Sequence, residues 1–283
     1  MSPSSRARVL SAAVAVLLPL TVAGCGAGGS TGGATASPSG SAHPTAPPSA
    51  TPSDDGPLTG RTVVIDPGHN PHNNRRIGEI SRLVDIGTKK KRCDTTGTAT
   101  NEGYPEAEFT LDVARHVRTL LERQGATVRL TQDGDRPWGP CIDERARIGN
   151  EAHADAVVSV HADGAPAGAR GFHVILPASV HEGAADTRHI VQPSRRLGKA
   201  LARDYKKATG FGPAAYAGGG DGLDVRGDLG GLNLSSVPKV FIECGNMRDP
   251  QDAAKLTDSA WRARAADGIA QGITDFLTGD GPS

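Results

Sequence analysis

The 283-residue sequence predicts a single α/β domain, built on a twisted, mostly parallel or mixed sheet with helices on both faces. Two observations support this fold class. Along residues 61–279, short apolar runs of strand type alternate with longer segments whose apolar residues recur at helical spacing. Strands separated by helices also favour crossover connections between neighbouring parallel strands. We find no internal repeat and no sign of a second domain.

The first elements of the domain are a buried-type strand at residues 62–65 and, after a long polar and Gly-rich excursion at residues 70–103, a helix at residues 106–124. The apolar residues of this helix lie three or four positions apart, at Phe109, Val113, Val117 and Leu120. Gly125 provides a stop signal for the helix, and a strand at residues 127–131 follows.

The later elements continue the alternation. Three further strands are predicted, at residues 156–160, 172–176 and 239–242. Three further helices are predicted, at residues 142–152, from an N-cap at Ser194 through Tyr205, and at residues 259–277.

Residues 1–24 have the features of a signal peptide. Arg6 and Arg8 precede an apolar stretch at residues 9–20 that is too short to span a bilayer. The sequence VAGC at residues 22–25 resembles the bacterial lipobox, in which small residues precede a cysteine that becomes lipidated after cleavage. We therefore expect lipidation at Cys25; the alternative is an ordinary secretory signal with an incidental cysteine.

Residues 25–60 are predicted to be a disordered tether, because Gly, Ala, Ser, Thr and Pro make up most of them and bury too little apolar surface to fold. A flexible chain of about 35 residues spans roughly 30 Å on average. The domain at residues 61–279 would thus be held just outside a membrane, and residues 280–283 would form a short tail.

The charge balance argues against a nucleic-acid partner. Without residues 1–24, Lys+Arg falls from 31 to 29 against 31 Asp+Glu, a net charge of about −2. The basic run at residues 89–92, KKKR, is most simply a solvated cluster, and its alternative role is attraction to an anionic wall polymer. The excursion at residues 70–103 that contains it is a candidate lid over a substrate site.

The four cysteines have different expected roles. Cys25 is assigned to the lipid, and Cys244 lies in an apolar strand. Cys93 and Cys141 are a candidate pair in an oxidising compartment, with two free thiols as the alternative. Their disulfide would close a loop of about 49 residues and stabilise the fold by roughly 4 kcal/mol.

Three predicted strands end in side chains that bind metals or move protons. VVIDPGH ends at His69, VVSVH at His161 and VFIE at Glu243. Residues just after the carboxyl ends of strands in an α/β sheet can converge although they are distant in sequence. Two imidazoles and a carboxylate form a known catalytic zinc set that leaves a fourth position for water. The carboxylate could be Glu243 or Glu106, which follows Pro105 at the start of the long helix.

Each of these residues also has a structural interpretation. Glu106 in a first helical turn is a good helix starter, because it interacts with the positive end of the helix dipole. Taken alone, His69 is equally well a loop histidine, and His161 a hydrogen-bonded core histidine. The case for a functional role is strongest for Glu243. A carboxylate buried directly after Val240, Phe241 and Ile242 must be paired or have a shifted pKa.

Together, these motifs resemble the zinc-dependent N-acetylmuramoyl-L-alanine amidases of the amidase-3 type, and in particular the compact actinobacterial members. The resemblance covers residues 61–279 and rests on VVIDPGH, GYPEAEFTLDVA, SVHAD and FIECGNM. It implies that His69, Glu106 and His161 bind one Zn²⁺, and that Glu243 is the catalytic carboxylate instead of a ligand. It also supports a disulfide between Cys93 and Cys141.

The activity that this resemblance implies is hydrolysis of the amide bond between N-acetylmuramic acid and the L-alanine of the peptidoglycan stem peptide, in cell-wall remodelling. Zinc would lower the pKa of a bound water and polarise the amide carbonyl, while Glu243 would carry the proton to the departing amine. The expected location is the cell-wall space, at the outer face of the bacterial cytoplasmic membrane. The expected partners are peptidoglycan and, through the lipid, that membrane; we expect a monomer.

Four further residues are candidates for holding an imidazole or contacting substrate: Asp66, Asn70, Asp163 and His173. Asp66 is the candidate partner of an imidazole, in the turn that presents His69. Asp163 stands where the family more often has Asn, and residues 246–247 also depart from its usual fourth motif. These departures affect substrate contacts more than the metal. His116 is expected to face solvent and His72 to be a loop residue.

Three other functions are alternatives to a zinc-dependent amidase. A cysteine amidase or peptidase would use Cys244 as its nucleophile, but strand alternation after Glu243 sends Cys244 to the opposite face of the sheet. A zinc deacetylase or peptidase of another polymer would share the metal site and differ in its products. An inactive peptidoglycan-binding lipoprotein is disfavoured because all four site residues are present.

Overall fold

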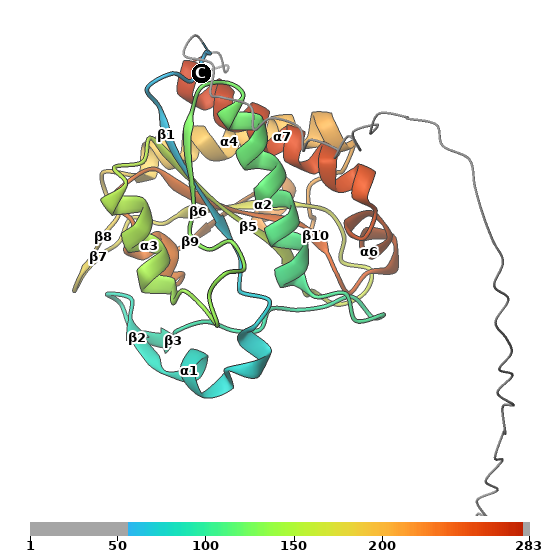
Figure 1. Cartoon of the computed structure of the whole chain (residues 1–283), viewed down its shortest axis with the longest axis horizontal. Coiled ribbons are helices and arrows are strands. Elements are labelled where there is room, and N and C mark those ends of the chain that lie inside the picture. Colours follow the sequence, from blue (N-terminus) through green and yellow to red (C-terminus); the bar gives the residue numbers. More distant parts are fainter. Residues whose placement is uncertain (1–55, 280–283) are drawn as a thin grey trace, which may run out of the picture. The chain divides into compact units, whose positions relative to one another are not determined.

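The computed structural model of the chain describes residues 56–279, whose centre is a six-stranded sheet in the order β4-β1-β5-β10-β6-β9 (Figure 1). The strands are β1 (Thr62–Pro67), β4 (Thr127–Leu130), β5 (Ala156–Asp163), β6 (His173–Pro177), β9 (Leu223–Arg226) and β10 (Lys239–Asn246). The predicted signal peptide, Cys25, most of the tether and residues 280–283 lie outside the described part, so those predictions stay untested.

The sheet is mixed, as the sequence predicts. β4, β1, β5 and β10 run parallel to one another, whereas β6 is antiparallel to β10 and carries β9 parallel to itself at the edge. The antiparallel pairing matters for the site, because it places His173 directly opposite Glu243.

One face of the sheet, here called the helix-covered face, lies under α2 (Glu106–Glu122), α4 (Val191–Thr209) and α7 (Ser259–Thr278). Alternate strand residues point into this core, among them Val63, Val158 and Ile242, all fully buried. The short α6 (Pro250–Leu256) adds Leu256 to it. Because these residues are apolar and tightly covered, this face supplies most of the hydrophobic stabilisation of the domain.

The opposite face, here called the site-bearing face, is covered only in part. α3 (Ile142–Glu151) packs Ile148 against Val64 and Val157, and α5 (Gly230–Asn233) lies beside α3. Elsewhere on this face, most residues of β1, β5 and β10 are polar or charged, namely Asp66, Ser159, His161, Lys239 and Glu243. Helices on both faces confirm the predicted fold class.

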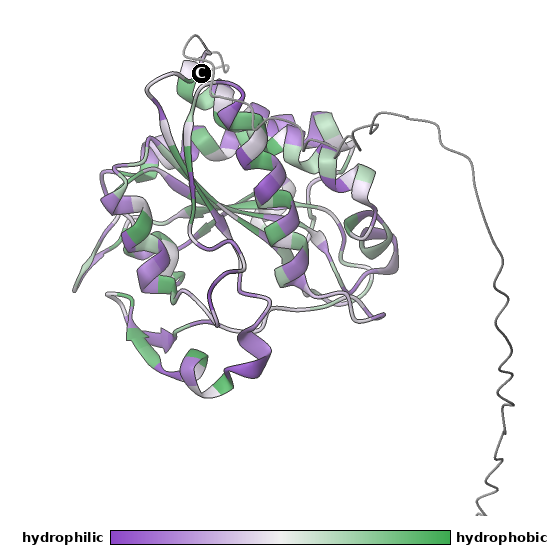
Figure 2. Cartoon of the chain, viewed as in Figure 1, coloured by the Kyte–Doolittle hydropathy of each residue, from purple (hydrophilic) through white to green (hydrophobic). Residues whose placement is uncertain are grey.

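Residues 70–103 form a lobe of short elements at the bottom of Figure 1, and Figure 2 shows that much of its ribbon is hydrophilic. The lobe contains a 3₁₀ turn at Asn73–Arg75, α1 (Ile77–Ser81), β2 (Leu83–Asp85) and β3 (Lys90–Arg92). We did not predict these elements, because three to five residues are too few to establish a hydrophobic period.

Several contacts tie this lobe to the rest of the domain. The predicted disulfide between Cys93 and Cys141 is present, with 4.4 Å between the two Cα atoms, and Cys141 is the N-cap of α3. The Nζ of Lys91 donates to the carbonyl of Asp228 at 2.9 Å, so the basic run is only partly solvated. The amide of Asn233 donates to the carbonyl of Ile86. These contacts hold the lobe in place over the site-bearing face.

Some predicted boundaries were wrong. β5 and β10 continue to Asp163 and Asn246, which brings the strand-end residues into the sheet itself. α4 begins at Val191, and Ser194 is buried inside it, where its hydroxyl accepts a hydrogen bond from the backbone of Lys239 instead of capping the helix. β9, α5, α6 and the β7–β8 hairpin (His181–Glu182 and Ala185–Asp186) are short and were missed.

The folded domain also starts earlier than predicted. Residues 56–60, placed in the tether, form a turn whose Leu58 is fully buried in the main core, and the backbone N–H of Leu58 donates to the carbonyl of Gln124 at 2.9 Å. A single leucine in a polar stretch gives no periodic signal. Among the described helices, none has the length and apolar character needed to cross a bilayer.

Candidate metal centre

Two histidines and a glutamate from distant segments converge on the site-bearing face. Possible ligand atoms of His69, Glu106 and His161 all lie within 4.8 Å of one another. Nε2 of His69 is 3.2 Å from one carboxylate oxygen of Glu106, and Nδ1 of His161 is 2.9 Å from the other. Of the two carboxylates that the sequence left open, Glu106 is therefore the one that lies between the imidazoles.

Glu106 is fixed by its position at the start of α2. Its carboxylate is nearly buried and accepts backbone hydrogen bonds from Thr98 at 2.9 Å and Ala162 at 3.2 Å. Burial opposes the charged form, but His69 and His161 outweigh burial and lower the pKa of Glu106. This carboxylate is therefore ionised, as a metal ligand must be.

His69 is presented by a tight turn after β1. Its φ is +62°, an uncommon value for a non-glycine residue, and its carbonyl accepts from the guanidinium of Arg145 at 2.7 Å and from the amide of Gln132 at 3.2 Å. A Cβ at the preceding Gly68 would lie 2.3 Å from the ring of His161. Glycine at this position therefore allows the His69 turn to approach His161.

The imidazole of His69 is oriented by Asp94, which we did not identify from the sequence. Nδ1 of His69 lies 3.3 Å from the carboxylate of Asp94 and 3.1 Å from the carbonyl of Thr95, which leaves Nε2 facing Glu106. Burial works to lower the pKa of His69, but the two carboxylates, Glu106 and Asp94, raise it to about 10. The same two carboxylates would also attract a metal cation, which binds the neutral form of the imidazole and displaces this proton.

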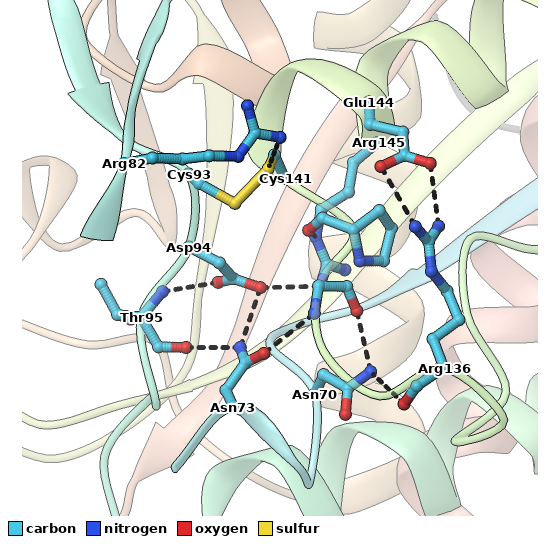
Figure 3. Close-up of a disulfide and its surroundings, with 12 residues drawn as sticks. Asn70, Asn73, Arg82, Cys93, Asp94, Thr95, Arg136, Cys141, Glu144 and Arg145 are labelled. Carbon is cyan, nitrogen blue, oxygen red and sulfur yellow. Dashed lines mark hydrogen bonds and ion pairs between the residues drawn. A yellow bond between two sulfur atoms is a disulfide. The ribbon is translucent and has the colours of Figure 1, made fainter. Parts of the chain in front are cut away.

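Arg145 of α3 connects this region to the disulfide. Figure 3 shows the carboxylate of Asp94, next to Cys93, bonded to the guanidinium of Arg145 and to the amide of Asn73. Burial tends to raise the pKa of Asp94, but Arg145 and His69 lower it to about 2. The disulfide thus joins the two segments that carry Asp94 and Arg145.

Asp66 does not hold an imidazole, contrary to our expectation. It is buried, and its carboxylate pairs with Arg145 at 2.7 Å and with Lys239 at 3.1 Å. Despite the opposing effect of burial, Lys239 and Arg145 lower the pKa of Asp66. Asp66 supports the site indirectly through Arg145, and Asp94 has the role that the sequence suggested for Asp66.

Glu243 lies beside the cluster, with His161 directly opposite it on β5 and His173 directly opposite it on β6. It is partly buried. Burial first, and then the negative charges of Glu106 and Asp163, raise the pKa of Glu243 well above the ordinary range. Of the two alternatives that the sequence left open for this carboxylate, a partner or a shifted pKa, the surroundings of Glu243 favour the shifted pKa.

The other candidates occupy different surroundings. Asp163 lines the same pocket as Glu243 and bonds to the hydroxyl of Tyr216. His173 is buried next to Tyr216, with 5.9 Å between the ring centroids. Asn70 does not face the site, since its amide donates to the carbonyl of Gly139 at 2.9 Å and braces a loop (Figure 3).

The space at the centre consists of two adjoining cavities. One, of about 210 Å³, is lined by Glu106, Glu243 and Asp163 together with Arg226. The other, of about 330 Å³, is lined by the Asp66 network, Ile142 and Arg92. Both cavities share His69, His161, Leu229 and Phe241, and the ring of Phe241 stacks on His161 at 5.2 Å. A substrate can therefore extend to either side of the two histidines.

The remaining residues named above lie elsewhere. Cys244 is fully buried in the core of the helix-covered face, where burial raises the pKa of its thiol. His116 is exposed, as expected, and His72 is a partly buried loop residue beside Arg75 and Arg76. None of the three contributes to the cluster.

Comparison with known proteins assigns most of the described domain to one protein family. A family model described as N-acetylmuramoyl-L-alanine amidase, Amidase_3, matches residues 63–275. The N-acetylmuramoyl-L-alanine amidase Rv3717 of Mycobacterium tuberculosis is 39% identical over 226 residues, covering 79% of this chain and 89% of the relative.

Two crystal structures of the N-acetylmuramyl-L-alanine amidase Ami1 are similar in both sequence and fold. The protein from Mycobacterium smegmatis is 38% identical, with a TM-score of 0.71 over 79% of this chain and 99% of its own. The protein from Mycobacterium abscessus is 41% identical, with a TM-score of 0.71 over 78% of this chain and 100% of its own. The region matched by the family model, residues 63–275, includes His69, Glu106 and His161.

Proposed function

Since the chain belongs to the Amidase_3 family and is an N-acetylmuramoyl-L-alanine amidase that hydrolyses peptidoglycan, we propose that it works with one zinc ion bound by His69, Glu106 and His161. The bond cleaved joins N-acetylmuramic acid to the L-alanine of the stem peptide. The observation that carries the metal proposal is the convergence of these three side chains from β1, α2 and β5.

The residues fit a zinc ion on chemical grounds. Two imidazoles and one carboxylate are a known ligand set for catalytic zinc. Each imidazole already turns one nitrogen toward the ionised carboxylate of Glu106, and Asp94 fixes the ring of His69 from its other nitrogen. Carboxylate partners of this kind orient histidine ligands and raise their basicity. When bound, zinc supplies Lewis-acid polarisation of the amide carbonyl and a water of lowered pKa.

Glu243 would be the general base and then the general acid. It would take a proton from the attacking water, whose oxygen bonds to the lactyl carbonyl carbon, and deliver that proton to the nitrogen of L-alanine as the carbon–nitrogen bond breaks. The position of Glu243 supports this role, because it lines the same cavity as His69, Glu106 and His161 without bonding to any of them.

The cysteine mechanism is disfavoured by the position of Cys244, and a zinc hydrolase of another polymer is disfavoured by membership of the Amidase_3 family. A cysteine mechanism requires Cys244 at the site, but that thiol points into the opposite core and its pKa is raised by burial. A zinc deacetylase or peptidase would use the same ligands on another bond. The products therefore distinguish these enzymes better than the ligands do.

The enzyme acts on the cell wall, and we propose that it is a monomer anchored at the outer face of the cytoplasmic membrane by a lipid on Cys25. Support comes from the sequence VAGC at residues 22–25 and from the tether-like composition that follows it. Mass spectrometry of the mature N-terminus tests this proposal, and a protein that begins at another residue without lipid would contradict it.

Metal analysis of the domain from residue 56 onward, together with mass spectrometry of digested peptidoglycan, tests the central proposal. We expect one zinc per chain and products with a free lactyl carboxylate and a free L-alanine amine. His69→Ala, Glu106→Ala and His161→Ala should each lower the bound zinc. Released acetate, a cut inside the peptide, or full activity in the presence of a chelator would each contradict it.

A further inference from the structure

The register of the sheet places three polar side chains in one row on the site-bearing face. Glu243 lies directly opposite His161 on one side and directly opposite His173 on the other. Directly paired residues on adjacent antiparallel strands have Cβ atoms roughly 4.5–5.5 Å apart and point to the same face. The carboxyl of Glu243 therefore stands between a candidate metal ligand and a second imidazole.

His173 is buried without a hydrogen bond that would explain its presence. Only 5% of the residue is exposed, and its Nδ1 is inaccessible and has no partner among residues 56–279. Its strand neighbours Val174 and Ile175 are apolar. A buried polar atom in a native protein normally has a partner, so an unpaired one requires an explanation.

Glu243 also lacks a partner, although it is only partly buried. Within the described part of the chain, its carboxyl forms no hydrogen bond and no ion pair, and the residue lines the smaller of the two cavities. Two side chains that lie opposite each other in the β10–β6 register thus both lack a hydrogen-bond partner within residues 56–279.

The ring of His173 also contacts an aromatic ring. The ring of Tyr216 meets it edge to face at 82°, and the hydroxyl of Tyr216 bonds to Asp163. Burial lowers the pKa of His173, against the raising effect of the Asp163 and Asp224 carboxylates, which favours a neutral ring. A neutral imidazole has one N–H and one lone pair, which exchange places between its two tautomers.

From this arrangement we propose that His173 is a positioning residue for the amidase reaction, whose Nδ1 bonds to the carboxyl of Glu243 while that carboxyl carries the proton. In the tautomer protonated on Nδ1, the ring donates to one oxygen of the carboxyl, while the other oxygen takes the proton from water and later delivers it to the leaving nitrogen. His173 gains and loses no proton overall. The inference rests on the proposed role of Glu243.

Two amide substitutions at the same position test this role. The amide of asparagine lies near the place of Nδ1, whereas that of glutamine lies near the place of Nε2, so His173→Asn should retain most of kcat and His173→Gln should not. His173→Leu, which removes every polar atom, should lower kcat about 10-fold or more with little change in KM, as expected for loss of an orienting partner. Zinc content should be unchanged in all three variants.

Steady-state kinetics on a soluble muropeptide, metal analysis and thermal melting are measured together, with Val174→Ala as a control for packing, since Val174 points into the opposite core. The control should melt earlier but retain kcat. The inference is overturned if His173→Leu keeps kcat within about twofold of wild type, or if His173→Asn and His173→Gln lower kcat equally. Loss of zinc in any of the three variants would also overturn it. Glu243→Gln is measured in parallel: an active Glu243→Gln enzyme would refute the proposed function itself, independently of His173.

Discussion

Neighbouring residues of β10 point to opposite faces of the sheet, and the two faces have different chemical environments. Ile242 and Cys244 enter the apolar core under α4 and α7, whereas Phe241 and Glu243 face the cavities of the metal centre. The helix-covered face is closed and apolar, and the site-bearing face is partly open and charged. A strand can therefore supply stability and chemistry at once, because its side chains alternate with a period of two.

The charged residues of the site-bearing face also form a structure of their own. Lys239, Asp66, Arg145 and Asp94 are all buried and linked in a chain of ion pairs that ends at His69. Such a network contributes less to stability than apolar packing of the same volume, because each charge loses its hydration. What it provides here is a fixed orientation for one imidazole and for the turn that carries it.

The largest effect should come from Glu243→Gln on the site-bearing face. Activity should fall by about 10²-fold or more, because the proton carrier is lost, while zinc content and melting temperature stay close to those of the wild type. Turnover on muropeptide and metal analysis measure this. If zinc were lost together with activity, Glu243 would be a ligand and its assignment would be wrong.

A core substitution on the helix-covered face should show the opposite pattern. Leu201→Ala removes a fully buried side chain of α4 and should destabilise the domain by about 2–5 kcal/mol. At temperatures below the melting transition, kcat should remain near that of the wild type. Denaturant unfolding and kinetics on the same sample test this; a large loss of kcat in the folded variant would show that the two faces are coupled.

Asp94→Asn tests the link between the charge network and the metal. It weakens the contact that orients His69 and should lower zinc affinity by roughly 10–100-fold, with activity largely restored at saturating zinc. Competition with a chelator measures the affinity. Asp85→Asn is a matched control in the same lobe, since within residues 56–279 the side chain of Asp85 accepts a hydrogen bond only from the backbone N–H of Gly87. An equal effect of both variants would argue against a specific role of Asp94.

Cys244→Ala should have the smallest effect on stability and activity, although Cys244 is next to Glu243 in the sequence. The thiol packs as a small apolar group, so its loss should cost about 1 kcal/mol of stability and leave activity unchanged. Thermal melting and turnover suffice as measurements. Loss of activity in a folded Cys244→Ala enzyme would revive the cysteine mechanism.

Much of the site could be predicted because it depends on local patterns. His69, His161 and Glu243 follow apolar strand runs, and the order of the motifs indicates the family. Asp94 and Arg145 give no such signal: they lie in a polar segment and on a short helix, and their function comes from pairing across 51 positions of sequence. Asp66 was identified as important but was assigned the wrong partner for the same reason.

The sequence by itself determined the strands and long helices, the alternation that separates the two faces, and the residue types that converge at the strand ends. Strand periodicity left open which carboxylate joins the two imidazoles; the family resemblance implied Glu106, and the tertiary structure places it between them. Only the tertiary structure decided which carboxylate orients His69 and that His173 lies opposite Glu243. The physical reason is that periodicity is a property of consecutive residues, whereas strand register and buried ion pairs depend on where distant segments meet in space.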